Sequence, residues 1–170
     1  TIIIYTADHG DLMGDFGTYF KSCFLNGSVH VPYLVKAPGV AGGQRRKQLA
    51  GLQDILPTLA ALAGCPLPKA IQGLDLSPVL RDENAPLRDV FYGSTIQPPH
   101  NAAMVFDGRW KYCYSQHGAT EELYDLAADP HELADRAAAN ASLVHSLAAA
   151  LPTNQDSNIE PREETPPPAS

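Results

Sequence analysis

A short apolar run followed at once by acidic and imidazole side chains is the most constraining feature of this sequence. Residues 2–5 have the length and apolar character of a buried strand, and the segment 6–11 (TADHGD) follows directly. In open α/β sheets, ligands bind beyond the carboxyl ends of the strands, where side chains leave the strict alternation between faces. Gly10 permits a sharp turn behind its neighbours. The pattern predicts that Asp8 and His9 converge on one ion, although a strand followed by an ordinary acidic turn has the same letters.

Further motifs follow in a fixed order along the chain. They are Gly14, Gly17 and Lys21, then Ser28–Val35 running into Ala37-Pro38-Gly39, Asp54–Leu59 closing at Gly64, Gly73–Leu80, Asp107–Tyr112, and Glu122–Leu126 with Asp129-Pro130. In this order and spacing, they resemble the later part of the sulfatase family within the alkaline-phosphatase-like superfamily. Each motif alone is weak, but the joint match covers about residues 1–151, which makes it specific.

The resemblance implies an α/β fold. We expect the C-terminal part of an alkaline-phosphatase-like α/β sandwich over residues 1–85, as part of the sulfatase catalytic domain. A small C-terminal α+β subdomain with an antiparallel sheet should follow over 86–151, and a disordered, proline-rich tail over 152–170. The tail has five prolines and few apolar side chains, so it cannot bury enough surface to offset its ordering entropy.

One helix is predicted in the first region and several in the second. Asp54 is a good N-cap for a helix that ends at Ala63, with Gly64 at its C′ position. Its buried stripe should consist of Leu56, Leu59, Ala60 and Ala63. Ala-rich helices should begin at Asp129-Pro130, which suits an N-cap and first helical position, and run to about Leu151.

Short strands are predicted at 31–36, 90–92, 102–106, 109–114 and 122–126. Asp107-Gly108 between two apolar runs predicts a hairpin, because both residues tolerate the positive φ of a type I′ turn. A third strand at 122–126 should extend this hairpin into the small antiparallel sheet.

The family's signature for its nucleophile is absent from these 170 residues. The resemblance implies a Cys or Ser within Cys/Ser-x-Pro/Ala-x-Arg, oxidised to formylglycine, whose hydrate attacks the sulfur of the ester. The nearest imitation, the segment 65–69 (CPLPK), differs at its third and fifth positions, so we interpret Cys65 as a small buried residue near a turn. The chain begins at Thr1 inside a strand, without Met. We therefore expect a C-terminal fragment that lacks the nucleophile and is inactive in isolation.

The resemblance also implies roles for three side chains. Asp8 and His9 are candidate metal ligands. Lys21, twelve residues after His9, matches the family lysine that binds the sulfate oxygens, which makes it both a catalytic and a substrate-binding candidate; a surface lysine is its structural alternative. The expected cation is divalent, with Ca²⁺ as first choice. Because calcium prefers oxygen ligands, a histidine ligand leaves Mn²⁺ or Zn²⁺ open.

Other histidines receive no role. His30 stands where the family usually has Arg, and Asn26-Gly27 stands where it usually has acidic residues. His100 and His117 lie in predicted loops that could rim a pocket, but a lone loop histidine is usually a polar surface residue.

Composition excludes several classes of partner. A formal net charge of −7 argues against a general nucleic-acid surface, and Arg45-Arg46-Lys47 is the only basic run. No apolar run approaches the roughly 20 residues that cross a bilayer, so no membrane segment is predicted. Three widely separated cysteines give no disulfide or zinc pattern. Oligomeric state and compartment stay open, with the periplasm or secretion as options if a signal segment precedes Thr1 and the cytoplasm otherwise.

The leading prediction is a metal-dependent sulfuric ester hydrolase that acts on a small-molecule or glycan sulfate ester. A metal ion and a lysine together neutralise charge on the non-bridging oxygens and help the alkoxide to depart. A phosphonate monoester or phosphodiester hydrolase of the same superfamily would share the Asp-His pair, and a non-catalytic remnant is a third alternative. Glycan, aryl and lipid sulfates all stay open as substrates.

Overall fold

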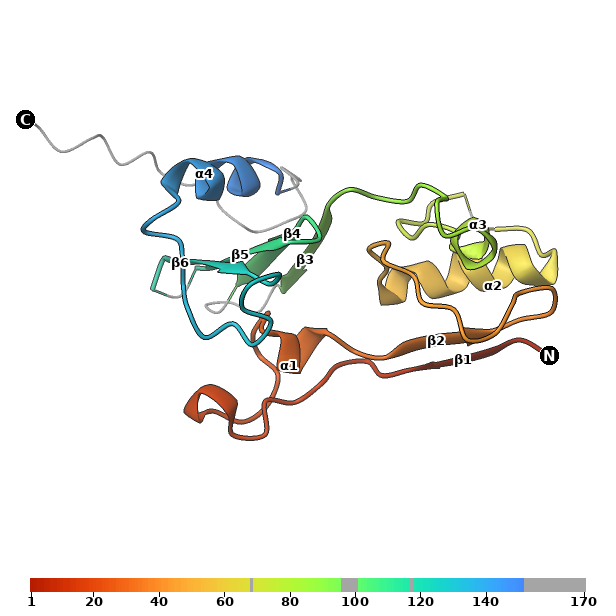
Figure 1. Ribbon diagram of the computed structural model, residues 1–170, viewed down its shortest axis with the longest axis horizontal. Helices are drawn as coiled ribbons and strands as arrows, with labels where there is room; N and C mark the ends of the chain where they lie inside the picture. Colours follow the sequence, from red (N-terminus) through yellow and green to blue (C-terminus); the bar gives the residue numbers. More distant parts are fainter. Residues whose placement is uncertain (68, 96–100, 117, 152–170) are drawn as a thin grey trace, which may run out of the picture. The chain divides into compact units, whose positions relative to one another are not determined.

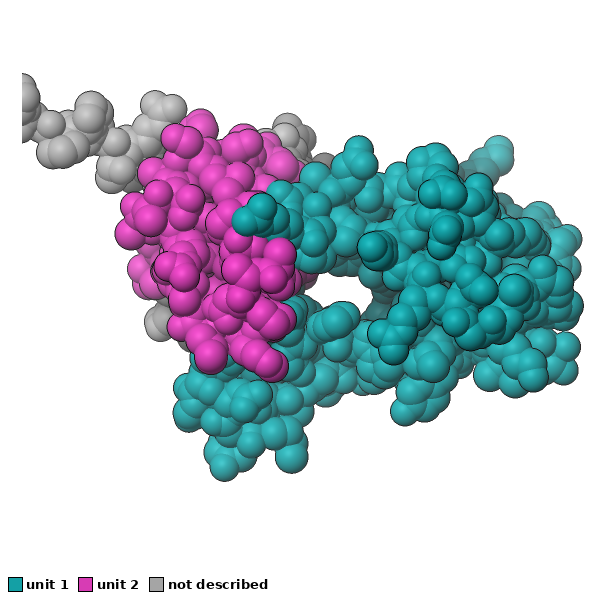
Figure 2. All heavy atoms as spheres, in the orientation of Figure 1, with its two compact units in different colours: residues 1–91, 106–109 teal, residues 92–105, 110–170 magenta. Residues whose placement is uncertain are grey.

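The chain divides into two compact units. The computed structural model describes residues 1–67, 69–95, 101–116 and 118–151. Residues 1–91 and 106–109 form unit 1, and residues 92–105 and 110–170 form unit 2 (Figure 2). The predicted domain division after residue 85 stays a prediction, because the units reflect contacts alone. The predicted disordered tail, 152–170, lies outside the described residues.

Unit 1 contains a two-stranded sheet and several short helices. Its elements are β1 (Ile3–Thr6), η1 (Asp15–Gly17), α1 (Asn26–Val29), β2 (Tyr33–Lys36), η2 (Leu52–Asp54), α2 (Ile55–Ala63) and α3 (Ser77–Arg81) (Figure 1). The strands predicted at 2–5 and 31–36 are thus confirmed. They pair antiparallel, with Ile3 opposite Lys36 and Tyr5 opposite Leu34.

Within the described residues, the first strand is only partly buried. Ile3 exposes 50% of its surface and Tyr5 exposes 65%, and Leu34 on the neighbouring strand is exposed as well. Because successive residues of a strand point to opposite faces, Ile4 and Thr6 lie on the other face and are half-buried. One face of the β1–β2 pair is therefore largely open.

Asp54 lies just before α2, as predicted, but its side chain does not cap that helix. The fully buried carboxylate accepts hydrogen bonds from the backbone N–H groups of Gly51 and Leu74, both at 2.8 Å, and from the Arg88 guanidinium at 2.6 and 2.7 Å. Burial alone would raise the pKa of Asp54, but the hydrogen bonds from Arg88, Leu74 and Gly51 bring it below its ordinary value. The predicted capping role is wrong because this carboxylate instead ties three separate segments together.

The predicted buried stripe of α2 is only partly confirmed. Ala60 is buried, whereas Leu56 exposes 54% of its surface and Ala63 is also exposed. Thr58 is fully buried instead, and its hydroxyl oxygen accepts a hydrogen bond from the N–H of Leu76 at 2.9 Å. A polar bond thus helps to set which face of α2 turns inward. The helix ends at Ala63, as predicted, and Gly64 follows it with φ 66°.

The second sheet has four strands in the order β3-β4-β5-β6. They are β3 (Phe91–Thr95), β4 (Ala102–Phe106), β5 (Trp110–Ser115) and β6 (Thr120–Asp125), and α4 (Ala141–Ala149) follows them (Figure 1). β5 and β6 pair antiparallel. Four of the predicted strands are therefore present in one sheet. Its core is tightly packed, with Ala103, Val105 and Leu123 fully buried and Tyr112 2% exposed.

The turn between β4 and β5 differs from the predicted type I′ hairpin. Three residues, 107–109, separate the strands, and Gly108 has φ 93° whereas Asp107 has no positive φ. The Asp107 carboxylate accepts a hydrogen bond from the N–H of Arg109 at 2.8 Å. The two-residue turn prediction is wrong because Asp107 uses its side chain to build a longer turn and only the glycine takes the left-handed conformation.

The predicted helices over 129–151 are reduced to α4. Glu132 has φ 58°, which no α-helix tolerates. The Asp129 carboxylate accepts from the N–H of Ala134, and Asp135 accepts from the N–H groups of Leu123 and Ala137, each at 2.9 Å. These aspartates give backbone N–H groups partners that a helix would otherwise supply, so the segment forms turns.

Candidate active site

Asp8 and His9 lie in the loop immediately after β1, as the sequence predicts. The His9 Nε2 atom is 3.4 Å from the Asp8 Oδ2 atom. The other Asp8 oxygen accepts a hydrogen bond from the His9 backbone N–H at 3.0 Å, which fixes the carboxylate beside the imidazole. The Asp8 side chain is 86% exposed and the His9 side chain 37%, so both groups are accessible.

The hydrogen bonds of His9 define its tautomer. Its Nδ1 atom is 2.7 Å from the carbonyl oxygen of Gly10, and a carbonyl oxygen only accepts. Nδ1 therefore carries a proton, and in the neutral imidazole Nε2 carries a lone pair. This is the arrangement in which one ring nitrogen is fixed by the backbone while the other is available to a cation.

Lys21 joins this pair. Its Nζ atom contacts the Nε2 atom of His9, where the ammonium can donate to the lone pair of the neutral imidazole. The Lys21 carbonyl oxygen accepts hydrogen bonds from the Ser28 hydroxyl at 2.6 Å and from the Cys23 N–H at 2.8 Å. The structure therefore brings together all three side chains that were singled out in the sequence, although their functional roles stay predictions.

A close crossing of two backbone segments holds the site. The Gly10 N–H donates to the carbonyl oxygen of Ser28 at 2.7 Å. A Cβ at Gly10 would overlap the carbonyl oxygen of Gly27, so only glycine fits. Sequence reasoning identified Gly10 as a turn residue but missed the role of Ser28, which is 2% exposed. Its hydroxyl donates to the Lys21 carbonyl oxygen, and its own carbonyl oxygen accepts from the Gly10 N–H. A lone serine in a single-turn helix such as α1 carries no local signal of such a role.

The other residues that were considered in the sequence lie outside this cluster or outside the described residues. His30 is exposed at the C-terminal end of α1. His100 and His117 lie outside the described residues. Cys65 is exposed, so the expectation that it is buried is wrong.

The donor set at Asp8 and His9 fits part of a metal site. Donor atoms 3.4 Å apart can be neighbouring ligands of one cation at about 2.0–2.4 Å. Two acceptors that face each other also favour a cation between them. Over the described ranges, however, no group of three or more His, Cys, Asp or Glu side chains could hold a metal ion. The lysine ammonium also contacts the nitrogen that an ion would use, so the two cations compete for it.

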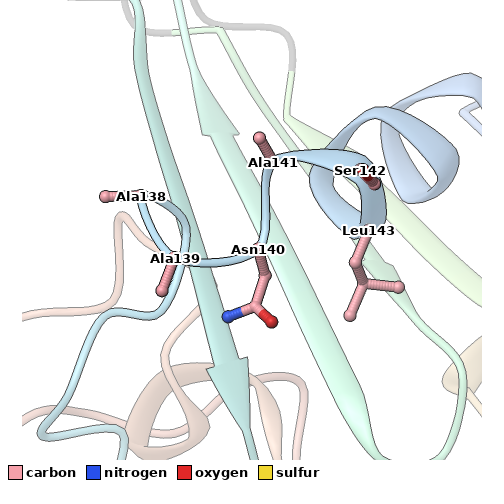
Figure 3. A pocket seen from close by; sticks show the side chains of 6 residues that line it. All are labelled: Ala138, Ala139, Asn140, Ala141, Ser142 and Leu143. Atoms are coloured by element: carbon pink, nitrogen blue, oxygen red, sulfur yellow. The ribbon is translucent and has the colours of Figure 1, made fainter.

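A surface depression of about 500 Å³ lies elsewhere, at the start of α4 (Figure 3). Its lining residues are Ala138, Ala139, Asn140, Ala141, Ser142 and Leu143. None of these six side chains is charged or a nucleophile activated by a base, so the depression lacks the chemistry of a hydrolytic site. Within the part of the chain that the structure describes, no helix is long and apolar enough to span a membrane.

The chain is similar to known proteins over most of its length. Residues 14–156 match the family described as N-sulphoglucosamine sulphohydrolase, C-terminal. Arylsulfatase K of Homo sapiens is 31% identical over 160 residues, which cover 86% of this chain and 30% of that protein. Choline-sulfatase of Rhizobium meliloti (strain 1021) is 35% identical over 142 residues, which cover 81% of this chain and 27% of that protein.

The fold has a close counterpart among solved structures. BT4656, in complex with its substrate D-glucosamine-2-N,6-O-disulfate, superposes with a TM-score of 0.79 at 26% identity. The superposition covers 88% of this chain and 33% of that one. The chain thus spans about 30% of the length of the curated relatives it matches. From the family match, the chain belongs to the sulfatase family and corresponds to its C-terminal region.

Proposed function

We propose that the chain contributes the sulfate-binding lysine and two metal ligands to the active site of a sulfuric ester hydrolase. The observation that carries the proposal is the contact between the Lys21 ammonium and the His9 imidazole, with the Asp8 carboxylate 3.4 Å from the same nitrogen. The names of the relatives, arylsulfatase K and choline-sulfatase, support a sulfate ester as the substrate.

The chemistry of ester hydrolysis explains why these groups belong together. A sulfate monoester carries negative charge on its non-bridging oxygens, and this charge must be held while the bond to the alcohol breaks. The Lys21 ammonium is exposed, so it can donate hydrogen bonds to such oxygens. Its Ser28-bound carbonyl oxygen holds the lysine backbone in place, which reduces the ordering that binding requires.

A divalent cation is part of this proposal. Asp8 and His9 are the residues that would hold it, with Ca²⁺ as first choice and Mn²⁺ or Zn²⁺ as alternatives. When bound, such an ion acts as a Lewis acid toward an ester oxygen. Further ligands and a formylglycine nucleophile would come from polypeptide other than these 170 residues, because the sequence lacks the nucleophile signature.

Anion binding tests the proposed role of the lysine. We would measure the affinity of the 170-residue chain for inorganic sulfate by NMR titration. We expect Lys21→Ala to abolish binding, whereas Lys36→Ala, a change at an exposed lysine at the end of β2, should leave it unchanged. Equal affinity in the two variants would contradict the proposal.

Catalysis is tested separately. We expect the 170-residue chain to hydrolyse neither 4-nitrophenyl sulfate nor phenylphosphonate monoesters, because the nucleophile is absent. Hydrolysis that Asp8→Ala abolishes would show that the chain holds its own nucleophile. The ratio of the two rates would then decide between a sulfatase and a phosphonate hydrolase.

A further inference from the structure

The segment that joins His9 to Lys21 exposes a group of large apolar side chains. Met13 exposes 78% of its surface, Phe16 50%, Tyr19 66% and Phe20 74%. We call residues 12–20 the aromatic loop. Single exposed apolar residues are ordinary on protein surfaces, but four of them within one short loop form a patch of the kind that marks an interaction site.

Both ends of the aromatic loop are fixed beside the candidate active site. The Asp11 carboxylate accepts hydrogen bonds from the N–H of Met13 at 2.9 Å and from the N–H of Phe20 at 3.3 Å. The Leu12 N–H donates to the carbonyl oxygen of Phe20 at 3.0 Å, and Leu12 itself is 3% exposed. The loop thus begins three residues after His9 and ends directly before Lys21, so both of its ends lie beside the candidate active site.

The backbone of the loop is strained. Met13, Phe16 and Phe20 have φ values of 53°, 56° and 76°, in the left-handed region that residues with a Cβ rarely adopt. Such conformations persist where the surrounding structure enforces them, and they cluster at ligand sites. Here they accompany side chains that remain in solvent, so local burial of those side chains does not account for the strain.

The charges around the loop narrow the class of ligand. Asp11 and Asp15 are exposed in this segment and are not among the proposed metal ligands, and Lys21 is the one lysine or arginine between residues 8 and 21. One ammonium can hold one sulfate group, but an alcohol portion that carries further anionic groups would meet repulsion from the carboxylates. An apolar alcohol portion would instead gain from contact with the exposed rings.

We propose that the aromatic loop binds the apolar alcohol portion of a sulfate monoester whose sulfate group is held by Lys21. This inference rests on the proposed function, because it uses the lysine as the sulfate site. It assigns the substrate to esters of aromatic or alkyl alcohols, and it makes Phe16 and Phe20 residues that determine specificity.

The test compares three probes on the 170-residue chain by NMR titration: inorganic sulfate, methyl sulfate and phenyl sulfate. We expect phenyl sulfate to bind about tenfold more tightly than methyl sulfate. This ratio is the gain in affinity expected when roughly 55 Å² of apolar surface is removed from water. The double variant Phe16→Asn with Phe20→Asn should bring this ratio close to one. Asn suits a positive φ, so the loop keeps its backbone conformation. Unchanged affinity for inorganic sulfate would show that the variant is folded.

Leu133→Asn is the matched control, because Leu133 is 77% exposed and lies outside the loop. It should leave the phenyl-to-methyl ratio unchanged. If Lys21-dependent sulfate binding occurs but the ratio is near one, or survives the double variant, the inference is overturned and the proposed function stands. If the unmodified chain binds none of the three anions, or if Lys21→Ala does not weaken their binding, both are overturned.

Discussion

Lys111 of β5 and Glu132 form an ion pair in which each side chain exposes only 2% of its surface. Glu132 reaches this position from the turn-rich segment after β6, with a left-handed backbone. The pair therefore fixes that segment to the sheet. Two charges so fully removed from water are stable only while both are present.

Breaking this pair should destabilise the protein. We expect Glu132→Gln to lower the free energy of unfolding by about 3 kcal/mol, because it removes the carboxylate that contacts the buried Lys111 ammonium. Urea unfolding measures the change. Leu133→Ala, at the exposed neighbouring position, should cost no more than about 0.5 kcal/mol. A loss from Glu132→Gln as small as that of the control would mean that the pair contributes nothing.

The Asp54–Arg88 pair should make stability depend on acid pH. The pKa of Asp54 in the folded chain lies below its ordinary value of 3.8, so its contribution is present above that pH and is lost as the pH falls through the folded-state pKa. Asp54→Asn should remove this contribution, so the melting temperature of the variant should fall less steeply as the pH is lowered. Thermal melts of both proteins between about pH 2 and about pH 7 would measure the effect. If the melting temperatures of the two proteins fall equally steeply in acid, the prediction is contradicted.

Glu122 of β6 should act in the opposite sense. Burial and then the Asp135 carboxylate raise its pKa above the ordinary value of 4.5. Folding therefore favours its protonated form, and the associated stability declines as the pH rises from about 4.5 through the folded-state pKa. Glu122→Gln should melt at a higher temperature than the unmodified chain at neutral pH, with the difference shrinking in acid. A lower melting temperature at neutral pH would show that the carboxylate is needed.

The Tyr33 hydroxyl is buried, and among the described residues it has no hydrogen-bond partner. Burial and the nearby Asp54 charge raise the pKa of Tyr33 to about 12. Tyr33→Phe removes a buried polar group that lacks a protein partner, so it should be neutral or stabilise the chain by up to about 1 kcal/mol. Denaturant unfolding checks this, and a clear loss of stability would reveal a hydrogen bond that the hydroxyl makes in solution.

Gly10→Ala should disrupt the candidate active site. The added Cβ overlaps the Gly27 carbonyl oxygen, so the two segments must separate and the Gly10–Ser28 hydrogen bond must break. We expect sulfate affinity to fall about tenfold or more, because a displacement of about 1 Å at such a site is costly. Gly42→Ala is the matched control, because a Cβ there meets open space. Equal sulfate affinities in the two variants would show that anion binding does not depend on the close approach of the two segments at Gly10.

The sequence was sufficient to predict those features that depend on residues close together in the chain. Asp8, His9 and Lys21 lie within fourteen residues of one another in a recognisable order, and the structure joins them. The strands of the second sheet were also readable from their apolar alternation. What the sequence could not supply is the long-range partner of a polar side chain. Asp54 looks like a helix cap until Arg88 is placed beside it, thirty-four residues away.

The same limit explains the lost helices. Ala-rich composition favours a helix over 129–140, but Asp129 and Asp135 offer their carboxylates to nearby backbone N–H groups. Glu132 enters the interior to meet Lys111. Local hydrogen bonds of two aspartates and the tertiary contact of Glu132 thus override the helix propensity of the alanines between them. No periodicity in the sequence indicates this outcome.

The Leu12 N–H bonds the Phe20 carbonyl oxygen at the base of the loop. Because this bond fixes the base, the position of Lys21 does not depend on the length of the loop. Closing a longer loop across a fixed base costs only about 0.6 kcal/mol for each doubling of its length. Insertions or deletions between residues 13 and 19 can therefore be tolerated without moving the lysine. The exposed side chains of this stretch can therefore change while the contact between Lys21 and His9 is kept.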